Sequence, residues 1–158
     1  MSPTEIITAA VALYGATLST ITLLLHQREK RQRIRVKLWL GFIGNPLVGV
    51  KDVVIIEAAN TGNAPVYISS YSYHLPERKK KVVGNFISDK PIPCTLAPGE
   101  GVQVWIESEK FVELVKAEGF KKEVQVVGEF SNKAGRVFRS EAQTLEIDKL
   151  LYAKRSTI

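Results

Sequence analysis

Two different hydrophobic patterns divide the chain. Residues 6–25 hold no charged side chain and are largely apolar, whereas from Ile34 onward apolar residues alternate with polar ones. An uncharged run of about twenty residues is what an α-helix needs to cross a bilayer, at about 1.5 Å of rise per residue. Alternation with a period of two is typical of a strand with one buried face. The pattern therefore predicts a membrane-spanning helix over 6–25, followed by a β domain.

Two other interpretations of the apolar run stay open. A secretory signal peptide carries positive charge before its apolar segment and a small-residue cleavage site after it. Here the leader 1–5 has no Lys or Arg, and the run ends in Leu23–Leu25 followed by His26. A core helix of a soluble protein would need apolar partners all round. We expect a membrane span in preference to either.

A basic segment, 26–33, follows the apolar run at once. Its cations are Arg28, Lys30, Arg31 and Arg33, and Arg35 and Lys37 come next. The window 26–37 supplies +5 of the formal net charge of +6, so the rest of the chain is nearly balanced, unlike a typical nucleic-acid-binding protein. Because Lys and Arg mark the cytoplasmic end of a span, we expect the N-terminus outside the cell (inner) membrane and the domain in the cytoplasm. The four cations of 26–33 are candidates for contact with anionic lipid.

The β domain is expected over 34–147. Turn residues and alternation predict strands at about 34–42, 51–59, 66–74, 82–83, 101–107, 124–130 and 137–147. Residues 85–98 look irregular. One short helix is expected after Ser108, which can cap it, and before Gly119, which can end it. Residues 148–158 are expected to form a fraying tail.

Seven short strands in this length fit an antiparallel β-sandwich. The phrases Asn60-Thr61-Gly62-Asn63-Ala64-Pro65-Val66 and Leu96-Ala97-Pro98-Gly99-Glu100 resemble turn segments of bacterial immunoglobulin-like domains, and so does the closing hairpin that ends with residues 135–140. The resemblance covers about 34–147 and implies a binding or spacing module with no active site. The paired cysteines of antibody-type domains are absent, and neither Trp39 nor Trp105 can be assigned as their core tryptophan.

Catalytic chemistry finds little support in the sequence. His26 and His74 are far apart in the chain, and no metal-ligand spacing occurs, so we expect neither a metal nor a cofactor. Cys94 would act as a nucleophile only beside an activating base. Its being the lone cysteine also agrees with a reducing compartment. We therefore expect a protein that is not an enzyme.

Three groups of residues are candidates for binding, each beside a structural interpretation. Thr8, Ala12, Ala16 and Thr20 recur every four residues and could let two spans approach closely. Tyr67, Tyr71 and Tyr73 could form an interface on one face of a strand, or could be partly buried sheet residues. Lys79, Lys80 and Lys81 could meet an acidic partner, or could lie in a solvated turn.

The sequence thus predicts a single-pass, membrane-anchored cytoplasmic protein whose β-sandwich engages another, unidentified protein. The alternative is a membrane effector, in which the span self-associates under control of the β domain. An enzyme is a third class. The expected partners are the lipid bilayer, a protein, and a second copy through the span, with nucleic acid disfavoured.

Overall fold

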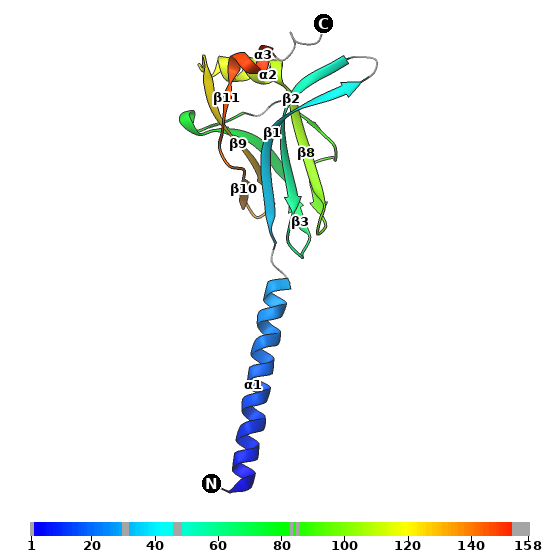
Figure 1. Ribbon diagram of the computed structural model, residues 1–158, viewed down its shortest axis with the longest axis vertical. Coiled ribbons are helices and arrows are strands. Elements are labelled where there is room, and N and C mark those ends of the chain that lie inside the picture. The colour runs from blue at the N-terminus through cyan, green and yellow to red at the C-terminus, as the bar shows by residue number, and fades with distance from the viewer. Residues whose placement is uncertain (1, 30–31, 46–48, 83, 85, 153–158) are drawn as a thin grey trace.

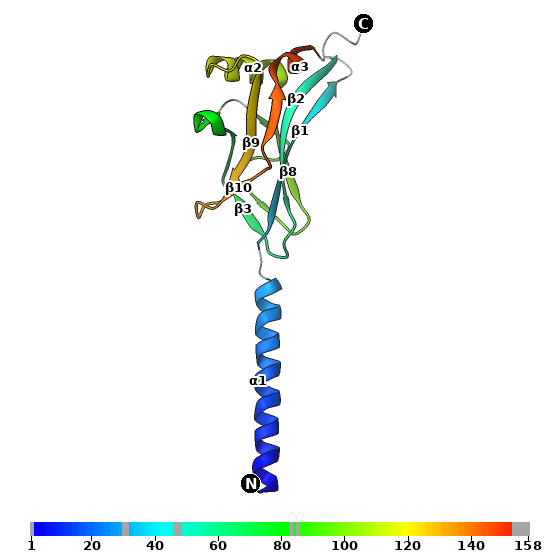
Figure 2. The same cartoon turned by 60° about the vertical axis from the view of Figure 1, so that its left-hand side comes forward.

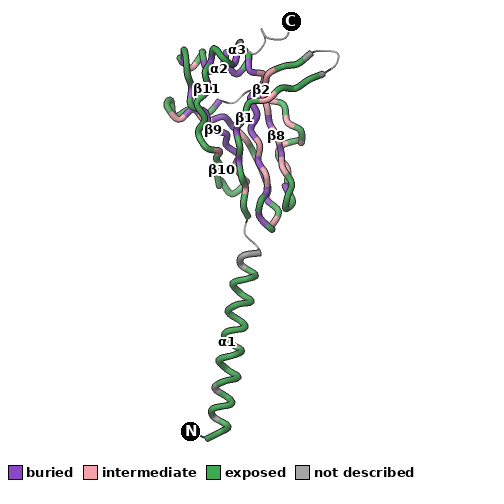
Figure 3. Tube along the Cα trace, viewed as in Figure 1, coloured by how far each residue is buried: buried purple, intermediate pink, exposed green. Residues whose placement is uncertain are grey.

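The computed structural model describes residues 2–29, 32–45, 49–82, 84 and 86–152. A long helix extends from one end of a β-rich body (Figure 1). Helix α1 spans Pro3–Glu29, and its described side chains are all exposed (Figure 3). Its stretch Ile6–His26 is long and apolar enough to cross a membrane, and none of that stretch is buried against the body. This finding is contrary to the core-helix interpretation.

The body consists of short strands with two helices at one end. In chain order the strands are β1 (Ile34–Asn45), β2 (Gly49–Asn60), β3 (Val66–Ile68), β4 (Ser70–Leu75), β5 (Lys80–Val82), β6 (Ile87–Ser88), β7 (Cys94–Leu96), β8 (Gly101–Glu107), β9 (Glu123–Ser131), β10 (Val137–Arg139) and β11 (Gln143–Glu146). The helices are a 3₁₀ turn, η1 (Pro76–Arg78), then α2 (Ser108–Ala117) and α3 (Ile147–Tyr152). Helices α2 and α3 lie at the end of the body farthest from α1 (Figures 1 and 2).

All strand pairs described are antiparallel. The first sheet has the order β1-β2-β8-β6, and the second has the order β10-β9-β4-β5, with β11 also paired to β9. Strands β3 and β7 form a small third sheet. The prediction of a mainly β, antiparallel fold behind an N-terminal apolar helix is confirmed.

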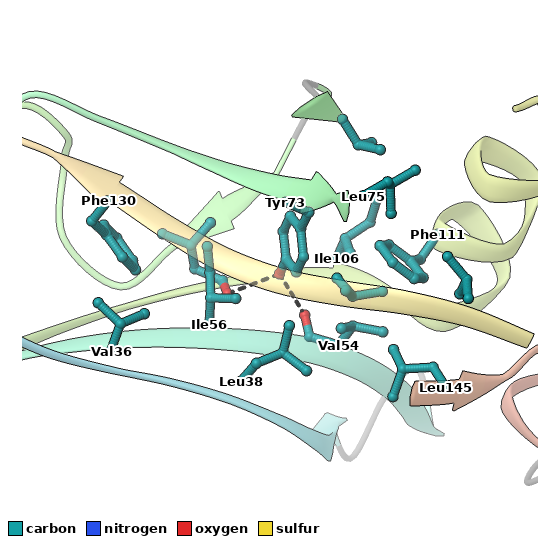
Figure 4. Close-up of a cluster of buried hydrophobic side chains, with 14 of the residues drawn as sticks. Val36, Leu38, Val54, Ile56, Tyr73, Leu75, Ile106, Phe111, Phe130 and Leu145 are labelled. Carbon is teal, nitrogen blue, oxygen red and sulfur yellow. Dashed lines mark hydrogen bonds between the residues drawn. The ribbon is translucent and has the colours of Figure 1, made fainter. Parts of the chain in front are cut away.

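The first and second sheets pack against each other through one hydrophobic core. Val54 and Ile56 of β2 face Tyr73 of β4 and Phe130 of β9, and all four are fully buried (Figure 4). The Tyr73 hydroxyl donates to the Val54 carbonyl oxygen at 2.8 Å. It also lies 3.3 Å from the Val104 carbonyl oxygen. Burial, with the Tyr71 hydroxyl nearby, raises the pKa of Tyr73 above its usual range. The neutral phenol therefore acts as a stable donor that joins the two sheets.

Two predicted strands are broken in the structure. The expected strand 66–74 divides at Ser69, because β3 pairs with β7 whereas β4 pairs with β9 in a different sheet. The expected return strand 137–147 divides into β10 and β11 at Ser140, whose hydroxyl accepts a hydrogen bond from the Gly128 amide at 2.9 Å. A side chain at Gly128 would clash with Ile56 across the core, so the sheets approach closely there.

Three further differences concern the loops and the helices. Residues 85–98 contain β6 and β7, which were not predicted. Ser108 lies within α2 instead of capping it, and the N-cap is Glu107, which makes no side-chain cap bond. The expected tail begins with α3, because Ile147 and Leu150 are buried in the core. Residues 153–158 lie outside the described part of the chain.

The first two strands run in opposite directions, as consecutive strands of an antiparallel sandwich do. Strand β1 leads away from α1, and the turn after β2 returns beside it, where the Thr61 amide donates to the Arg33 carbonyl at 2.9 Å. In the same place the Gln32 side chain donates to the Pro65 carbonyl at 3.3 Å. The turn between β1 and β2 includes residues 46–48, which lie outside the described residues.

Candidate functional site

Strand β1 has one edge that pairs with no described strand. The Thr61 amide bonds to the Arg33 carbonyl, and the register of β1 with β2 continues without interruption from there. Because hydrogen-bonded pairs alternate along an antiparallel ladder, the odd-numbered residues of β1 bond to β2. The amide and carbonyl groups of the even-numbered residues point to the other side. Among the described residues, no backbone hydrogen bond reaches that side of β1.

A groove lies between this edge of β1 and the β10–β11 edge of the second sheet. It consists of two neighbouring hollows of about 330 and 590 Å³. Successive residues of β1 line both hollows, with Glu141 and residues 143–146 opposite. We call this region the edge groove. Its walls along β1 are Arg35, Val36, Lys37, Leu38, Trp39, Leu40, Gly41 and Phe42.

The end of the edge groove farther from α1 is apolar and open to solvent. Leu40 is 50% exposed and Phe42 is 76% exposed, although both lie on the face of β1 that buries Val36 and Leu38. Leu145 and Leu150 line the opposite wall. Phe42 lies opposite Asp52 of β2, beyond Val53, where the register of β2 with β8 begins, so no described third strand extends the sheet there. Leu40 lies opposite Val54, just inside that limit. An exposed apolar group of this kind is typical of an interaction surface.

Polar groups lie at fixed places among these apolar walls. Asp52 and the Glu146–Lys149 ion pair, with 2.7 Å between its charged atoms, line the same hollow. The hydroxyl of Ser108 also belongs to this wall, is buried, and has no hydrogen-bond partner among the described residues. An unpaired buried hydroxyl costs free energy that a hydrogen-bonding occupant would recover.

The outer face of the first sheet carries a row of apolar side chains. The register places Trp39 beside Ile55, Ile55 beside Trp105, and Trp105 beside Ile87. Trp39 covers Gly41, where an added Cβ would lie 2.9 Å from its ring. Both tryptophans thus lie on the outer face of this sheet, and neither belongs to the core between the sheets, a point that the sequence left open. This row adjoins the edge groove through Trp39.

The three predicted tyrosines do not share one surface. Tyr67 is 40% exposed on β3. Tyr71 is half-buried on β4 and packs edge-on against Phe86, with ring centres 5.7 Å apart. Tyr73 is completely buried, so it offers a partner no surface and matches the alternative of a buried sheet residue.

The three predicted lysines differ in their surroundings. Lys79 ends η1 in the left-handed conformation and is exposed. Lys80 forms an ion pair with Glu118. Lys81 bonds at 2.7 Å to Glu129, whose side chain is only 2% exposed. The turn lies beside α2, in the half of the body farther from α1 (Figure 1).

Glu129 is the centre of a small charged cluster. Burial alone would raise its pKa, but hydrogen bonds from Lys81 and from Arg139, the latter at 2.6 Å, hold the pKa below its usual value. Lys81 therefore stabilises the fold, and Lys79 is the member of the predicted trio for which the described residues show no ion pair.

The residues expected to act at the membrane lie on or beside α1. Thr8, Ala12, Ala16 and Thr20 are all exposed. The Thr8 and Thr20 hydroxyls donate to carbonyl oxygens one turn earlier, each at 2.8 Å, so the helix satisfies them itself. Among the predicted lipid contacts, Arg28 lies in α1 and Arg33 is exposed. Lys30 and Arg31 lie outside the described residues.

Cys94 and His74, two candidates for chemistry in the sequence, lie in strands of different sheets. Cys94 lies in β7, where burial is the main reason that the pKa of its thiol is raised, so it stays protonated at neutral pH. The Nδ1 atom of His74 is 3.1 Å from the Lys80 carbonyl oxygen. Within the described residues, no group of three or more His, Cys, Asp or Glu side chains could hold a metal ion.

Sequence reasoning missed the edge groove, because the alternation that starts at Ile34 predicts one buried face along the whole first strand, and Leu40 and Phe42 lie on that face. Strand length carried a hint, since the strand predicted at 34–42 is longer than the one predicted at 101–107, but length does not show which strands lie beside it.

Comparison with known proteins found no family model and no curated protein that matches this chain.

Proposed function

We propose that this protein is a single-pass, membrane-anchored adaptor whose β body binds another protein. The observation that carries the proposal is the edge groove, where Leu40 and Phe42 remain exposed beside an unpaired strand edge. Exposed strand edges are normally protected in soluble proteins, because they can pair with other chains. An edge that is open and lined with apolar side chains supports a role in binding.

We further propose that the body belongs to the immunoglobulin-like class of sandwiches. Support comes from two packed antiparallel sheets and from a hydrogen bond of 2.9 Å between the two turn phrases of the resemblance, which the Asn60 side-chain nitrogen donates to the Leu96 carbonyl oxygen. The same class argues for recognition without chemistry. The raised pKa of the Cys94 thiol supports this, since it disfavours the thiolate that a nucleophile requires.

The proposed location is the inner cell membrane, with the N-terminus outside and the body in the cytoplasm. It is supported by the basic residues that follow α1 and by the absence of Lys and Arg before it. Protease added to intact cells should spare residues 34–158 and should degrade them after the membrane is opened. Digestion of the body in intact cells would reverse the proposed orientation.

Photo-crosslinking of the full chain in native membranes tests the binding function. Benzoylphenylalanine would replace Phe42, Tyr67, Lys79 or, as a remote control, the exposed Lys133, and adducts would be identified by mass spectrometry. We expect one defined protein to be crosslinked from Phe42 and not from Lys133. Absence of any protein adduct from the first three positions would refute the adaptor function.

A further inference from the structure

We propose that β1 accepts an extended segment of the partner as an added antiparallel strand. This inference rests on the proposed function, since it names the segment that the adaptor takes. The even-numbered residues from Val36 to Phe42 direct their amide and carbonyl groups away from β2. A strand placed beside them would bond to those groups and extend the first sheet, as in other cases of strand addition.

A second copy anchored in the same membrane does not fit this edge. Copies in one membrane are related by an axis along the membrane normal, and β1 continues in the general direction of α1 (Figures 1 and 2). A twofold rotation about that axis leaves both β1 strands pointing the same way and turns the same edge of each toward the other. Antiparallel pairing needs opposite directions, so two copies related in this way cannot pair through this edge as antiparallel strands. The occupant that gives antiparallel pairing is therefore a segment of a different protein.

The neighbours along β1 define the chemistry of that segment. Side chains directly opposite one another on adjacent strands interact, so its inward positions would meet Leu40 and Phe42 and should be apolar. Its outward positions would meet Arg35 and Lys37, both exposed and neither in an ion pair among the described residues. The register places Glu57 beside Lys37 and Ala59 beside Arg35 on β2, and Glu141 lines the same hollow. Charge complementarity with the two cations favours acidic side chains at the outward positions opposite them. The segment thus alternates apolar and acidic residues.

The direction of β1 also fixes the direction of the segment. Because β1 runs away from α1, an antiparallel partner runs toward it. The C-terminal end of the bound segment then lies near Arg35, and its N-terminal end lies near Phe42. This polarity can be measured independently of affinity.

The test uses the full chain in detergent micelles and a synthetic peptide of alternating Val and Glu, with an alternating Val and Lys peptide as its counterpart. Amide hydrogen exchange is followed by NMR for β1. We expect the Val–Glu peptide to slow exchange of the Leu38 and Leu40 amides by about tenfold, equivalent to about 1.4 kcal/mol. The amides of Lys37 and Trp39, already bonded to β2, should not change. A spin label on the peptide's C-terminus should broaden the NMR signal of the Arg35 amide more than that of the Phe42 amide.

Charge reversal provides the matched variants. Lys37→Glu should weaken binding of the Val–Glu peptide and strengthen binding of the Val–Lys peptide. Lys133→Glu, an equal charge change in a remote turn, should alter the affinity of neither peptide. Leu40→Pro removes one outward amide without touching the β2 ladder and should weaken binding more than Leu40→Ala does. Equal effects of the two Leu40 variants would overturn strand addition.

The remaining outcomes separate this inference from the adaptor function. Unchanged exchange at Leu38 and Leu40 with peptide at about 1 mM would overturn strand addition. Slow exchange at these amides that grows with protein concentration, without peptide, would overturn it in favour of a second copy. In either case a defined adduct from Phe42 would still support the adaptor function, whereas no adduct from any tested position would remove that function as well.

Discussion

The side-chain amide nitrogen of Asn60 donates to the carbonyl oxygen of Leu96 at 2.9 Å, which joins the ends of β2 and β7, 36 positions apart in the chain. The same nitrogen donates to the Ala64 carbonyl, also at 2.9 Å, and the Asn60 side-chain oxygen accepts the Gly62 amide at 3.0 Å. Asn60 is 1% exposed. One buried amide thus holds together the turn after β2 and the end of β7, beside the point where the body meets the segment after α1.

Replacing this amide should destabilise the body. Asn60→Ala removes three side-chain hydrogen bonds and leaves buried backbone groups unpaired, so we expect the free energy of unfolding to fall by about 3 kcal/mol. Asn63→Ala, an exposed residue of the same turn, should change it by less than about 0.5 kcal/mol. Denaturant unfolding of the full chain in micelles, followed by β-type circular dichroism, measures both. Similar losses in the two variants would contradict a special role for Asn60.

A second prediction concerns the hydroxyl that joins the two sheets. Tyr73→Phe keeps the ring in the core but leaves the Val54 carbonyl without this donor, so we expect a loss of about 1 to 2 kcal/mol. Tyr67→Phe alters a 40% exposed side chain and should be neutral. The same unfolding measurement applies. A neutral Tyr73→Phe would mean that the hydroxyl contributes nothing to the packing of the sheets.

The sequence predicted most of the fold where local patterns decide it. Alternation located β1, β2, β8 and β9, and Gly119, with φ of +91°, ends α2 as expected of a C-terminal glycine. It failed where tertiary pairing decides. Nothing in Val66–His74 signals that Ser69 separates two sheets, and α3 is helical because Ile147 and Leu150 bury themselves.

The candidate site was less accessible to prediction. The exposure of Phe42 depends on which strands lie beside β1 and where each ends, and a single sequence does not show this. Likewise, a run of lysines cannot reveal that Lys81 pairs with a buried carboxylate from a distant strand. Charge runs and tyrosine spacing therefore indicated surfaces that the fold uses partly for its own stability.

The pH dependence of stability should report on Glu129. Its folded pKa is lowered, so its contribution is fully present above the unfolded value of about 4.3 and is lost as pH falls through the folded pKa. Glu129→Gln should lower the free energy of unfolding by about 2 kcal/mol at pH 7. The difference in this free energy between the variant and the native chain should shrink below about pH 4. Glu141→Gln, which is exposed, is the control. A difference that stays constant with pH would show that the charge of Glu129 is not what stabilises the fold.

The last prediction separates an anchor from an active span. Ala12 and Ala16 are exposed on α1 with Thr8 and Thr20, and replacing both alanines with Leu would fill the surface through which two helices could approach closely. The added side chains are apolar and preserve membrane insertion. If α1 only anchors the body, the double variant should give the same yield of crosslinked protein from position 42 as the native chain. Ile7→Leu with Val11→Leu, at the same spacing on another side of the helix, controls for the number of changes. A loss of yield confined to the alanine pair would favour the alternative function, in which the span self-associates and the β body controls that association.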